Sequence, residues 1–343
     1  MGAVDEMRQL LGGLDPARGG QPPDEERRGR DLRRILASTP AVVGAARVAP
    51  RRRLLLVAAA AAVTAVAAGA VIEATRAPQP VYAATPPILH YQPSVSAESA
   101  GSRLRQLAEV ASAAPAPVRP PGTVEHLHST NWFLNSAVSG GNTTSVVVPQ
   151  EWRSWRTDDD AGRRIKRALP PTFRSDAERR KWLADGGSVG PSEEVTDYRS
   201  GEFRRGWRGA VPADESVRGW LTAAGSEHDA PVQYLEDVAE LAGVRLLGPA
   251  QRAAALRLLA DLPGMTVAGT VVDRAGRTGE AFAMTSDVHG LPTEYTIIID
   301  PRTGVFLGYE EVLTTSAGKL NVPIPAVISY RSYLGAEYTT MPR

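Results

Sequence analysis

The longest apolar stretch of the chain covers Leu54–Ile72, nineteen consecutive residues without a charged side chain. It begins directly after Arg51, Arg52 and Arg53 and ends before Glu73. At about 1.5 Å per residue, a helix over this stretch is roughly 28 Å long, close to the thickness of the hydrocarbon core of a bilayer. Because a helix satisfies its own backbone hydrogen bonds in lipid, we predict one transmembrane helix from Leu54 to Ile72, with the three arginines as its anchor.

Two other interpretations of this stretch stay open. A buried core helix would usually carry a polar interruption. A cleavable signal peptide has a short basic leader, whereas 53 residues precede this stretch, although Val81-Tyr82-Ala83 offers a small-residue cleavage pattern near Ala83. Basic residues are more frequent before the stretch than after it, so the positive-inside rule places residues 1–53 in the cytoplasm and residues 73–343 outside the cell membrane.

The residues before the predicted span form a basic tail with one amphipathic segment. Asp24 suits a helix N-cap, and Leu32, Ile35 and Leu36 give the following residues an apolar stripe, so we predict a helix over residues 24–38. So narrow a stripe cannot sustain a domain, and we expect the helix to dock on a cytoplasmic regulator such as a sigma factor, to lie on the lipid bilayer or to form transiently. A solvated, mostly disordered tail is the alternative.

Beyond the predicted span, residues 73–84 form a stalk and residues 85–343 one exported domain. Apolar spacing predicts a helix over residues 97–113 and an amphipathic helix pair around residues 234–242 and 249–262. A period of two predicts strands over residues 124–133, 144–155, 265–272, 280–285, 292–299, 304–313 and 326–334. Closely spaced strands joined by short turns form antiparallel meanders, so the predicted fold class is α+β.

Composition and charge narrow the chemistry. The chain contains no cysteine, which excludes disulfides, thiolate zinc sites, iron–sulfur clusters and thiol nucleophiles. The net charge of +1 is unevenly distributed, because residues 1–53 hold eleven arginines against seven acidic residues while the remainder is net acidic. An acidic exported part, together with arginines that adjoin anionic lipid, argues against nucleic-acid binding.

The clearest metal-ligand pattern is His126-Leu-His128, because residues two apart on a strand point to the same face. A third ligand would have to come from His90, His228, His289 or an aspartate elsewhere in the chain. Such a pair also suits a solvated strand face without a metal.

A cluster of three aspartates in Asp158–Gly162 resembles part of a calcium loop. Its spacing departs from that of the twelve-residue loop and favours a hairpin turn. The sequence contains no Walker loop, dinucleotide fingerprint, nucleophile elbow or zinc-protease helix. These observations favour a non-enzymatic protein without a cofactor.

The order of the segments and several short motifs resemble an actinobacterial family of single-pass membrane proteins that is known by a locus-tag name. The motifs are turns and packing positions at Ala83–Pro87, Val148–Trp152 with Arg163, Leu262–Gly264, Asp273–Arg277 and Asp300–Gly304. This chain differs from the family by a longer insertion around Ser192–His228. The exported domain is also similar to the half-barrels of lipoprotein carriers and anti-sigma-factor regulators, which implies a curved antiparallel sheet, helices on its concave face and an apolar cavity for acyl chains.

We therefore expect a membrane-anchored extracytoplasmic protein that binds or senses a lipid or another envelope component and is linked to a cytoplasmic regulator. The alternative is a structural or lipid-carrier protein of the envelope with an inert tail. A third hypothesis, an extracytoplasmic metal-dependent hydrolase, depends on His126 and His128.

Overall fold

The computed structural model describes most of the chain from residue 85 onward, in the ranges 85–93, 98–139, 142–173, 175–184, 192–203, 207, 209–223, 228–320 and 322–342. The predicted tail with its docking segment, the transmembrane helix with its arginine anchor, and the stalk lie outside the described residues. Within these ranges, no helix combines the length and the hydrophobicity that a membrane span requires.

The described helices lie in two parts of the chain, one before the first strand and the others in its middle. They are α3 (Ala100–Ala113), α4 (Asp176–Ala184), α5 (Val217–Thr222), α6 (Pro231–Val244) and α7 (Pro249–Ala260). The first group of strands is β1 (Val124–Ser139), β2 (Asn142–Val147), β3 (Gln150–Arg156), β4 (Gly162–Ala168) and β5 (Glu193–Tyr198). The second group is β6 (Thr266–Val272), β7 (Thr278–Ser286), β8 (Thr293–Ile299), β9 (Phe306–Leu313) and β10 (Ala326–Thr339).

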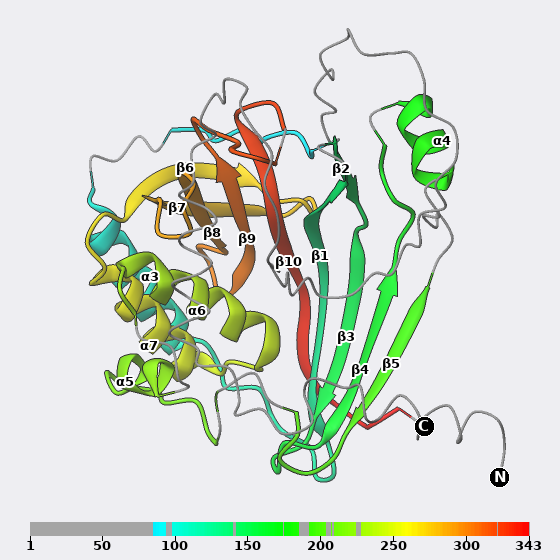
Figure 1. Ribbon diagram of the computed structural model, residues 1–343. Helices are drawn as coiled ribbons and strands as arrows, with labels where there is room; N and C mark the ends of the chain where they lie inside the picture. Colours follow the sequence, from blue (N-terminus) through cyan, green and yellow to red (C-terminus); the bar gives the residue numbers. More distant parts are fainter. Residues whose placement is uncertain are drawn as a thin grey trace, which may run out of the picture. The chain divides into compact units, whose positions relative to one another are not determined.

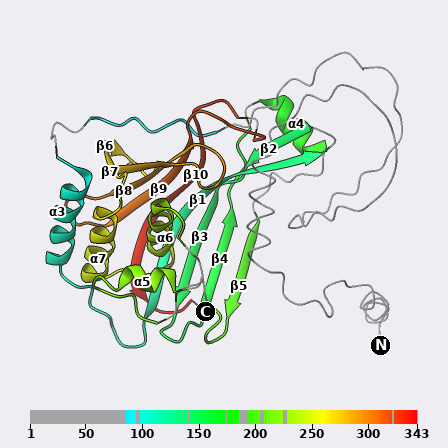
Figure 2. The same cartoon turned by 60° about the vertical axis from the view of Figure 1, so that its left-hand side comes forward.

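These strands form one curved antiparallel sheet, which confirms the predicted α+β class (Figures 1 and 2). The strand order is β5-β4-β3-β1-β10-β9-β8-β7-β6, and β2 extends the far end of β1 as a hairpin. The five C-terminal strands form the expected meander. The first group joins it through β1 and β10, which pair over most of their length.

The predicted and observed elements agree best where the apolar pattern continues over many residues. The predicted strand over residues 144–155 is wrong in one respect, because it is divided into β2 and β3 around Pro149, whose nitrogen cannot donate to a neighbouring strand. Four elements were not predicted: β4, α4, β5 and α5. The insertion around Ser192–His228 contains β5 and α5.

Helices α6 and α7 pack on one face of the sheet, which we name the helix face. Large side chains from both layers are almost fully buried there, including Phe282, Tyr295, Ile297, Ile299, Leu235, Leu241, Leu256 and Leu259. Helix α3 packs against α7 and completes this core. Over β7–β9, the helix face is therefore filled by the side chains of the chain itself.

Part of the opposite face of the sheet, the strap face, is covered by residues 85–93, which we name the strap. Ile88 and Tyr91 pack among apolar strand residues of that face. Gln92 exchanges two backbone hydrogen bonds with Thr270 of β6, at 2.8 and 2.9 Å. Because the strap buries the second face, the middle strands of the meander have two apolar faces and not one.

Candidate ligand-binding site

Strand register brings three side chains together at one end of the helix face. Glu125 of β1 pairs with Arg156 of β3 on one side and with Tyr338 of β10 on the other. Side chains that lie directly opposite in antiparallel strands point to the same face and have neighbouring Cβ atoms. These three therefore project side by side from adjacent strands.

The turn after β3 fixes the Arg156 side chain. It connects β3 to β4 through residues 157–161, and Asp160 adopts a φ of 59°, a left-handed conformation that aspartate tolerates better than most residues. The Asp160 carboxylate forms an ion pair with Arg156 Nη2. The turn thus places the Asp160 carboxylate next to Arg156, the last residue of β3.

The hairpin turn predicted for Asp158–Gly162 is confirmed. Its three carboxylates have three different partners: the first pairs with Arg119 at 2.8 Å, the second accepts from the Thr157 hydroxyl, and the third pairs with Arg156. The three aspartates therefore make separate contacts that stabilise the turn and the residues next to it.

The connection between α6 and α7 supplies a second arginine. Arg245 directly follows α6, its Nε lies 3.4 Å from Glu125 Oε2, and its Nη1 donates to the Gly209 carbonyl oxygen at 2.9 Å. The backbone N–H of Leu246 donates to the same Glu125 oxygen at 3.2 Å, and Arg156 Nη1 lies 4.0 Å from it. One carboxylate oxygen is therefore shared by two guanidinium groups and a backbone donor.

This ionic network is buried. The side chains of Arg156, Glu125 and Arg245 are 4%, 13% and 11% exposed. Nε and Nη1 of Arg156 have no hydrogen-bond partner among the described residues. Burial lowers the pKa of Arg245 below its ordinary value, Glu125 opposes this shift, and the charge of Arg156 reinforces it. The two arginines thus face two carboxylates, Glu125 and Asp160, while two N–H groups of Arg156 have no acceptor among the described residues.

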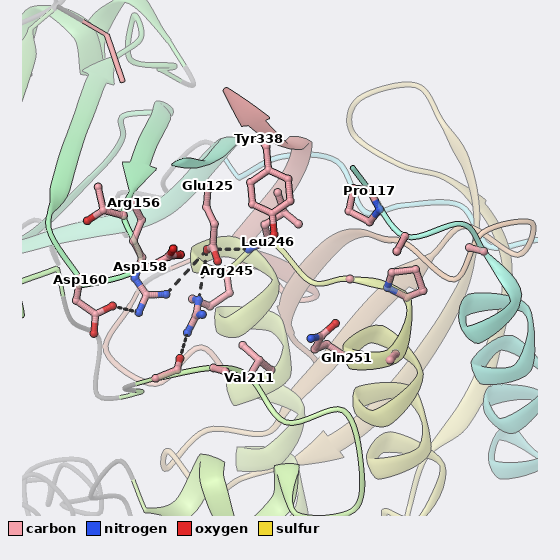
Figure 3. Close-up of a pocket in the computed structure, with 18 of the residues that line it drawn as sticks. Pro117, Glu125, Arg156, Asp158, Asp160, Val211, Arg245, Leu246, Gln251 and Tyr338 are labelled. Carbon is pink, nitrogen blue, oxygen red and sulfur yellow. Dashed lines mark hydrogen bonds and ion pairs between the residues drawn. The ribbon is translucent and has the colours of Figure 1, made fainter. Parts of the chain in front are cut away.

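A cavity of about 690 Å³ opens beside the network, and we name it the charged cavity (Figure 3). Its walls come from the end of α3 and the loop after it, the ends of β1, β3 and β10, the turn after β3, residues 209–211, and residues 245–246 and 248–251. Figure 3 shows Glu125 between the two guanidinium groups, with Tyr338 and Gln251 on the cavity wall. The volume lies in the usual range of small-molecule sites.

No known protein-family model matches this chain, and no curated protein matches it. The interpretation of the charged cavity therefore depends on its own geometry. The resemblance to an actinobacterial membrane family and to half-barrel carriers stays a prediction.

A second cavity of about 300 Å³, which we name the inner cavity, shares Pro117, Arg245 and Leu246 with the charged cavity. Apolar side chains such as Phe306 and Leu334 contribute to its wall. Arg252 of α7 also lines it and donates from Nη1 to the Leu247 carbonyl oxygen at 2.8 Å, while its buried Nε has no hydrogen-bond partner in the part of the chain that the structure describes. Burial lowers the pKa of Arg252, and among the described residues no carboxylate forms a salt bridge with it.

The predicted metal pair points to the sheet face opposite to the ionic network, as strand alternation requires. His126 stacks on Trp155 with ring centroids 4.8 Å apart, and its Nδ1 lies 3.3 Å from a Glu337 carboxylate oxygen. His128 Nε2 lies 2.7 Å from a Glu151 carboxylate oxygen. The structure thus gives each histidine its own carboxylate, and no group of three potential metal ligands gathers within the described ranges.

Sequence reasoning did not identify Glu125, Arg156, Asp160 or Arg245 as site residues. Each is a charged residue at the end of an element or in a turn, where charged residues are common for structural reasons. Glu125 and Arg245 are 120 residues apart in the chain. Only the register of β1 with β3 and the packing of α6 on the sheet bring them together.

Proposed function

We propose that this chain is a non-enzymatic, membrane-anchored extracytoplasmic protein that binds or senses an envelope component in the charged cavity. The carrying observation is that buried Arg156 and Arg245 share Glu125 at the wall of a cavity of about 690 Å³. Buried ionic groups cost free energy to desolvate, and next to a cavity such groups are typical of recognition sites.

We propose binding and not catalysis because of the contacts that the charged side chains of the cavity make. Glu125 and Asp160 both contact arginines, so the carboxylates of the network act as partners of fixed cations. A general base would need a carboxylate within reach of a substrate proton. The arrangement suits the orientation of a charged ligand, and we propose no cofactor.

The proposed location in the cell membrane depends on the sequence of residues 54–72 and of the arginines before them. The strap follows the predicted stalk directly in the chain and is hydrogen-bonded to β6. A covalent connection of this kind suits a domain that transmits its ligand state to a cytoplasmic tail. The partner proposed for the tail helix of Leu32, Ile35 and Leu36 is a cytoplasmic regulator such as a sigma factor.

Binding is tested on the full chain in detergent micelles with a thermal-unfolding screen of lipids and polar envelope compounds. We expect at least one compound to raise the unfolding temperature of the wild type, and the Ala250→Trp variant to abolish that rise. Ala250 is exposed on the cavity wall, so its replacement fills the cavity without removing a buried contact. Val272→Trp, at an exposed strand position 56% accessible to solvent, is the matched control. A stabilising compound that is insensitive to Ala250→Trp contradicts the assignment of the charged cavity.

The topology and the signalling role need separate experiments. A reporter fused after Arg343 should be active only outside the cytoplasm, and cytoplasmic activity contradicts the proposed orientation. Deletion of residues 24–38 should abolish the phenotype of a signalling protein while leaving its membrane insertion intact. An unchanged phenotype favours the inert-tail alternative.

The alternative function, a structural or lipid-carrier role, is favoured by one observation, the partly apolar inner cavity with Arg252 in its wall. A carrier would use this cavity for an amphipathic ligand. Extraction of lipid from the purified wild type, and its loss in a Leu334→Trp variant, would support this alternative over the charged cavity. For the third hypothesis, metal analysis of the purified chain should find zinc if His126 and His128 hold a metal.

A further inference from the structure

We infer that the inner cavity binds a small amphipathic monocarboxylate, with its carboxylate on Arg252 and its apolar part against the leucine and phenylalanine side chains of the wall. This inference goes beyond the proposed function, because it assigns a ligand class to a second cavity and does not require the charged cavity to be occupied. Two features support it: an arginine that has no carboxylate partner among the described residues, and a wall that is otherwise mostly apolar.

The arginine is Arg252 of α7, and only one of its nitrogen atoms has an acceptor in the part of the chain that the structure describes. Nη1 donates to the Leu247 carbonyl oxygen at 2.8 Å, whereas Nη2 and the buried Nε make no hydrogen bond there. Burial lowers the pKa of Arg252, and no described carboxylate offsets the shift, in contrast to Arg245, where Glu125 does. Because a guanidinium group stays protonated at neutral pH, Arg252 carries a positive charge that no described carboxylate balances.

The other two arginines of the wall already have carboxylate partners. Arg277 pairs with Asp273 and donates to two backbone carbonyl oxygens, and Arg245 lies 3.4 Å from Glu125. Within the described ranges, no acidic residue lines the inner cavity itself. Of the three positive charges in the wall, that of Arg252 is therefore the one left for a ligand.

The unpartnered edge of Arg252 favours a carboxylate. Nε and Nη2 of a guanidinium group donate in nearly parallel directions, so they can reach both oxygens of one carboxylate. In Arg252 these are the two nitrogen atoms that have no acceptor among the described residues, while Nη1 is held by the backbone of Leu247. One such edge and one unbalanced charge suit a ligand with a single negative charge.

The rest of the wall suits an apolar group. Side chains of β1, β9, β10 and the connection between α6 and α7 contribute to it, namely Leu127, Leu246, Leu247, Phe306 and Leu334. The Tyr333 hydroxyl does not compete for the ligand, because it donates to the Ala239 carbonyl oxygen at 2.6 Å. A volume of about 300 Å³ is at the lower end of the range of small-molecule sites, so the apolar part of the ligand is expected to be short.

The probes are hexanoate and hexanamide, which have nearly the same shape and differ in charge. Their binding is measured by calorimetry on the full chain in detergent micelles, with protein-free micelles as the blank. We expect saturable binding of hexanoate, weakened about tenfold or more by Arg252→Met, a change equivalent to about 1.4 kcal/mol. Hexanamide should bind the wild type more weakly than hexanoate does, and Arg252→Met should change its affinity less than about twofold. Unchanged hexanamide binding also verifies that the variant is folded.

Three further variants locate the site. Leu334→Trp narrows the inner cavity and should weaken the binding of both probes. Ala250→Trp fills only the charged cavity and should leave hexanoate binding unchanged, because Ala250 does not line the inner cavity. Arg105→Met is the matched control for Arg252→Met, since Arg105 is more than half exposed and lines neither cavity, and it should change the affinity less than about twofold.

The outcomes separate this inference from the proposed function. If hexanoate does not bind, binds no better than hexanamide, or binds Arg252→Met as well as the wild type, the inference is wrong. Loss of hexanoate binding in Ala250→Trp but not in Leu334→Trp places the probe in the charged cavity, which contradicts the inference and supports the proposed function. Hexanoate binding that is sensitive to Arg252→Met and insensitive to Ala250→Trp supports the inference, even if no compound passes the test of the charged cavity.

Discussion

Arg274 connects the strap to the sheet through Glu310. Its Nη2 lies 2.6 Å from a Glu310 carboxylate oxygen and also donates to the Pro87 carbonyl oxygen at 2.9 Å. The Glu310 side chain is 1% exposed, and burial raises its pKa from 4.5 to about 7, although Arg274 opposes the shift. The sheet therefore holds a carboxyl group under the strap that titrates near neutral pH.

The pH dependence of stability should change when Glu310 is replaced by glutamine. A carboxyl group with a raised pKa binds its proton more tightly in the folded state, so its contribution to stability is complete below about pH 4.5 and is lost as the pH rises through 7. Between pH 5 and pH 8, we expect this group to remove up to about 3 kcal/mol from the free energy of unfolding. Urea unfolding of the full chain in detergent at both pH values should therefore show a smaller difference for Glu310→Gln than for the wild type.

The control for this experiment is Glu109→Gln, since the Glu109 side chain is 71% exposed. It should leave the difference between the two pH values unchanged. If Glu310→Gln also leaves it unchanged, Glu310 does not titrate in this range in the folded state.

Removing one charged member of the buried ionic network should lower the free energy of unfolding, because the remaining members lose their partner. Arg156→Met leaves Asp160 without its cation and Glu125 with Arg245 as its remaining cation, and breaking such a buried pair typically costs about 3–5 kcal/mol. Urea unfolding should therefore show a loss of this size, and the double variant with Asp160→Asn should recover part of it. Arg105→Met removes a pair in which both side chains are more than half exposed, and it should cost less than about 1 kcal/mol. Similar losses for Arg156→Met and Arg105→Met would show that burial does not strengthen the network.

Local periodicity predicted α3, the helix pair and the meander, because each of these elements buries a regular apolar stripe or alternation. It could not predict α4, which has no buried residue and therefore no apolar stripe. Nor could it predict the strap, whose apolar residues 88, 89 and 91 follow neither a helical nor a strand period. The pairing of β1 with β10 joins Val124 to Thr339, and a register over such a separation is set by packing and not by local sequence.

The candidate site could be predicted less well than the fold. The sequence predicted His126 and His128 as candidate metal ligands because they are two residues apart on one strand. A metal site also needs ligands from other strands, which local sequence does not predict. Glu125 stands directly before His126 and contacts Arg245 through the tertiary structure. A single charged residue at the end of a helix or strand looks the same in the sequence whether it lines a site or only contacts solvent. The strand register and the burial of the side chains are needed to distinguish the two.

Replacing either of two arginines near the inner cavity by methionine should change the free energy of unfolding by very different amounts. Arg277 pairs with the buried Asp273 carboxylate and donates to two backbone carbonyl oxygens, at 2.6 and 2.7 Å. Among the described residues, Arg252 donates to one carbonyl oxygen, that of Leu247, and forms no salt bridge. We expect Arg277→Met to cost about 3 kcal/mol or more, and Arg252→Met to change the free energy of unfolding by less than about 1 kcal/mol. Urea unfolding of both variants tests this contrast, and equal losses would contradict the smaller contribution assigned to Arg252.

The attachment of the strap should depend on Gly269. This residue adopts a φ of 124°, and an added Cβ would lie 2.1 Å from the Gln92 carbonyl oxygen, a backbone atom that cannot move alone. Gly269→Ala therefore requires both backbone strain and separation of the strap from β6, and we expect it to cost at least about 2 kcal/mol. Gly276→Ala is the matched control, because its φ is 80° but no atom lies within 4 Å of the added Cβ, and strain alone should cost about 1 kcal/mol.

Hydrogen exchange distinguishes the two causes of the loss in Gly269→Ala. If the strap separates, the amide of Gln92, which donates to Thr270 at 2.8 Å in the wild type, should lose its protection while α6 and α7 keep theirs. Gly276→Ala should leave the amide of Gln92 protected. Equal stability losses in the two variants, with Gln92 still protected in both, would mean that the strap does not require a glycine at position 269.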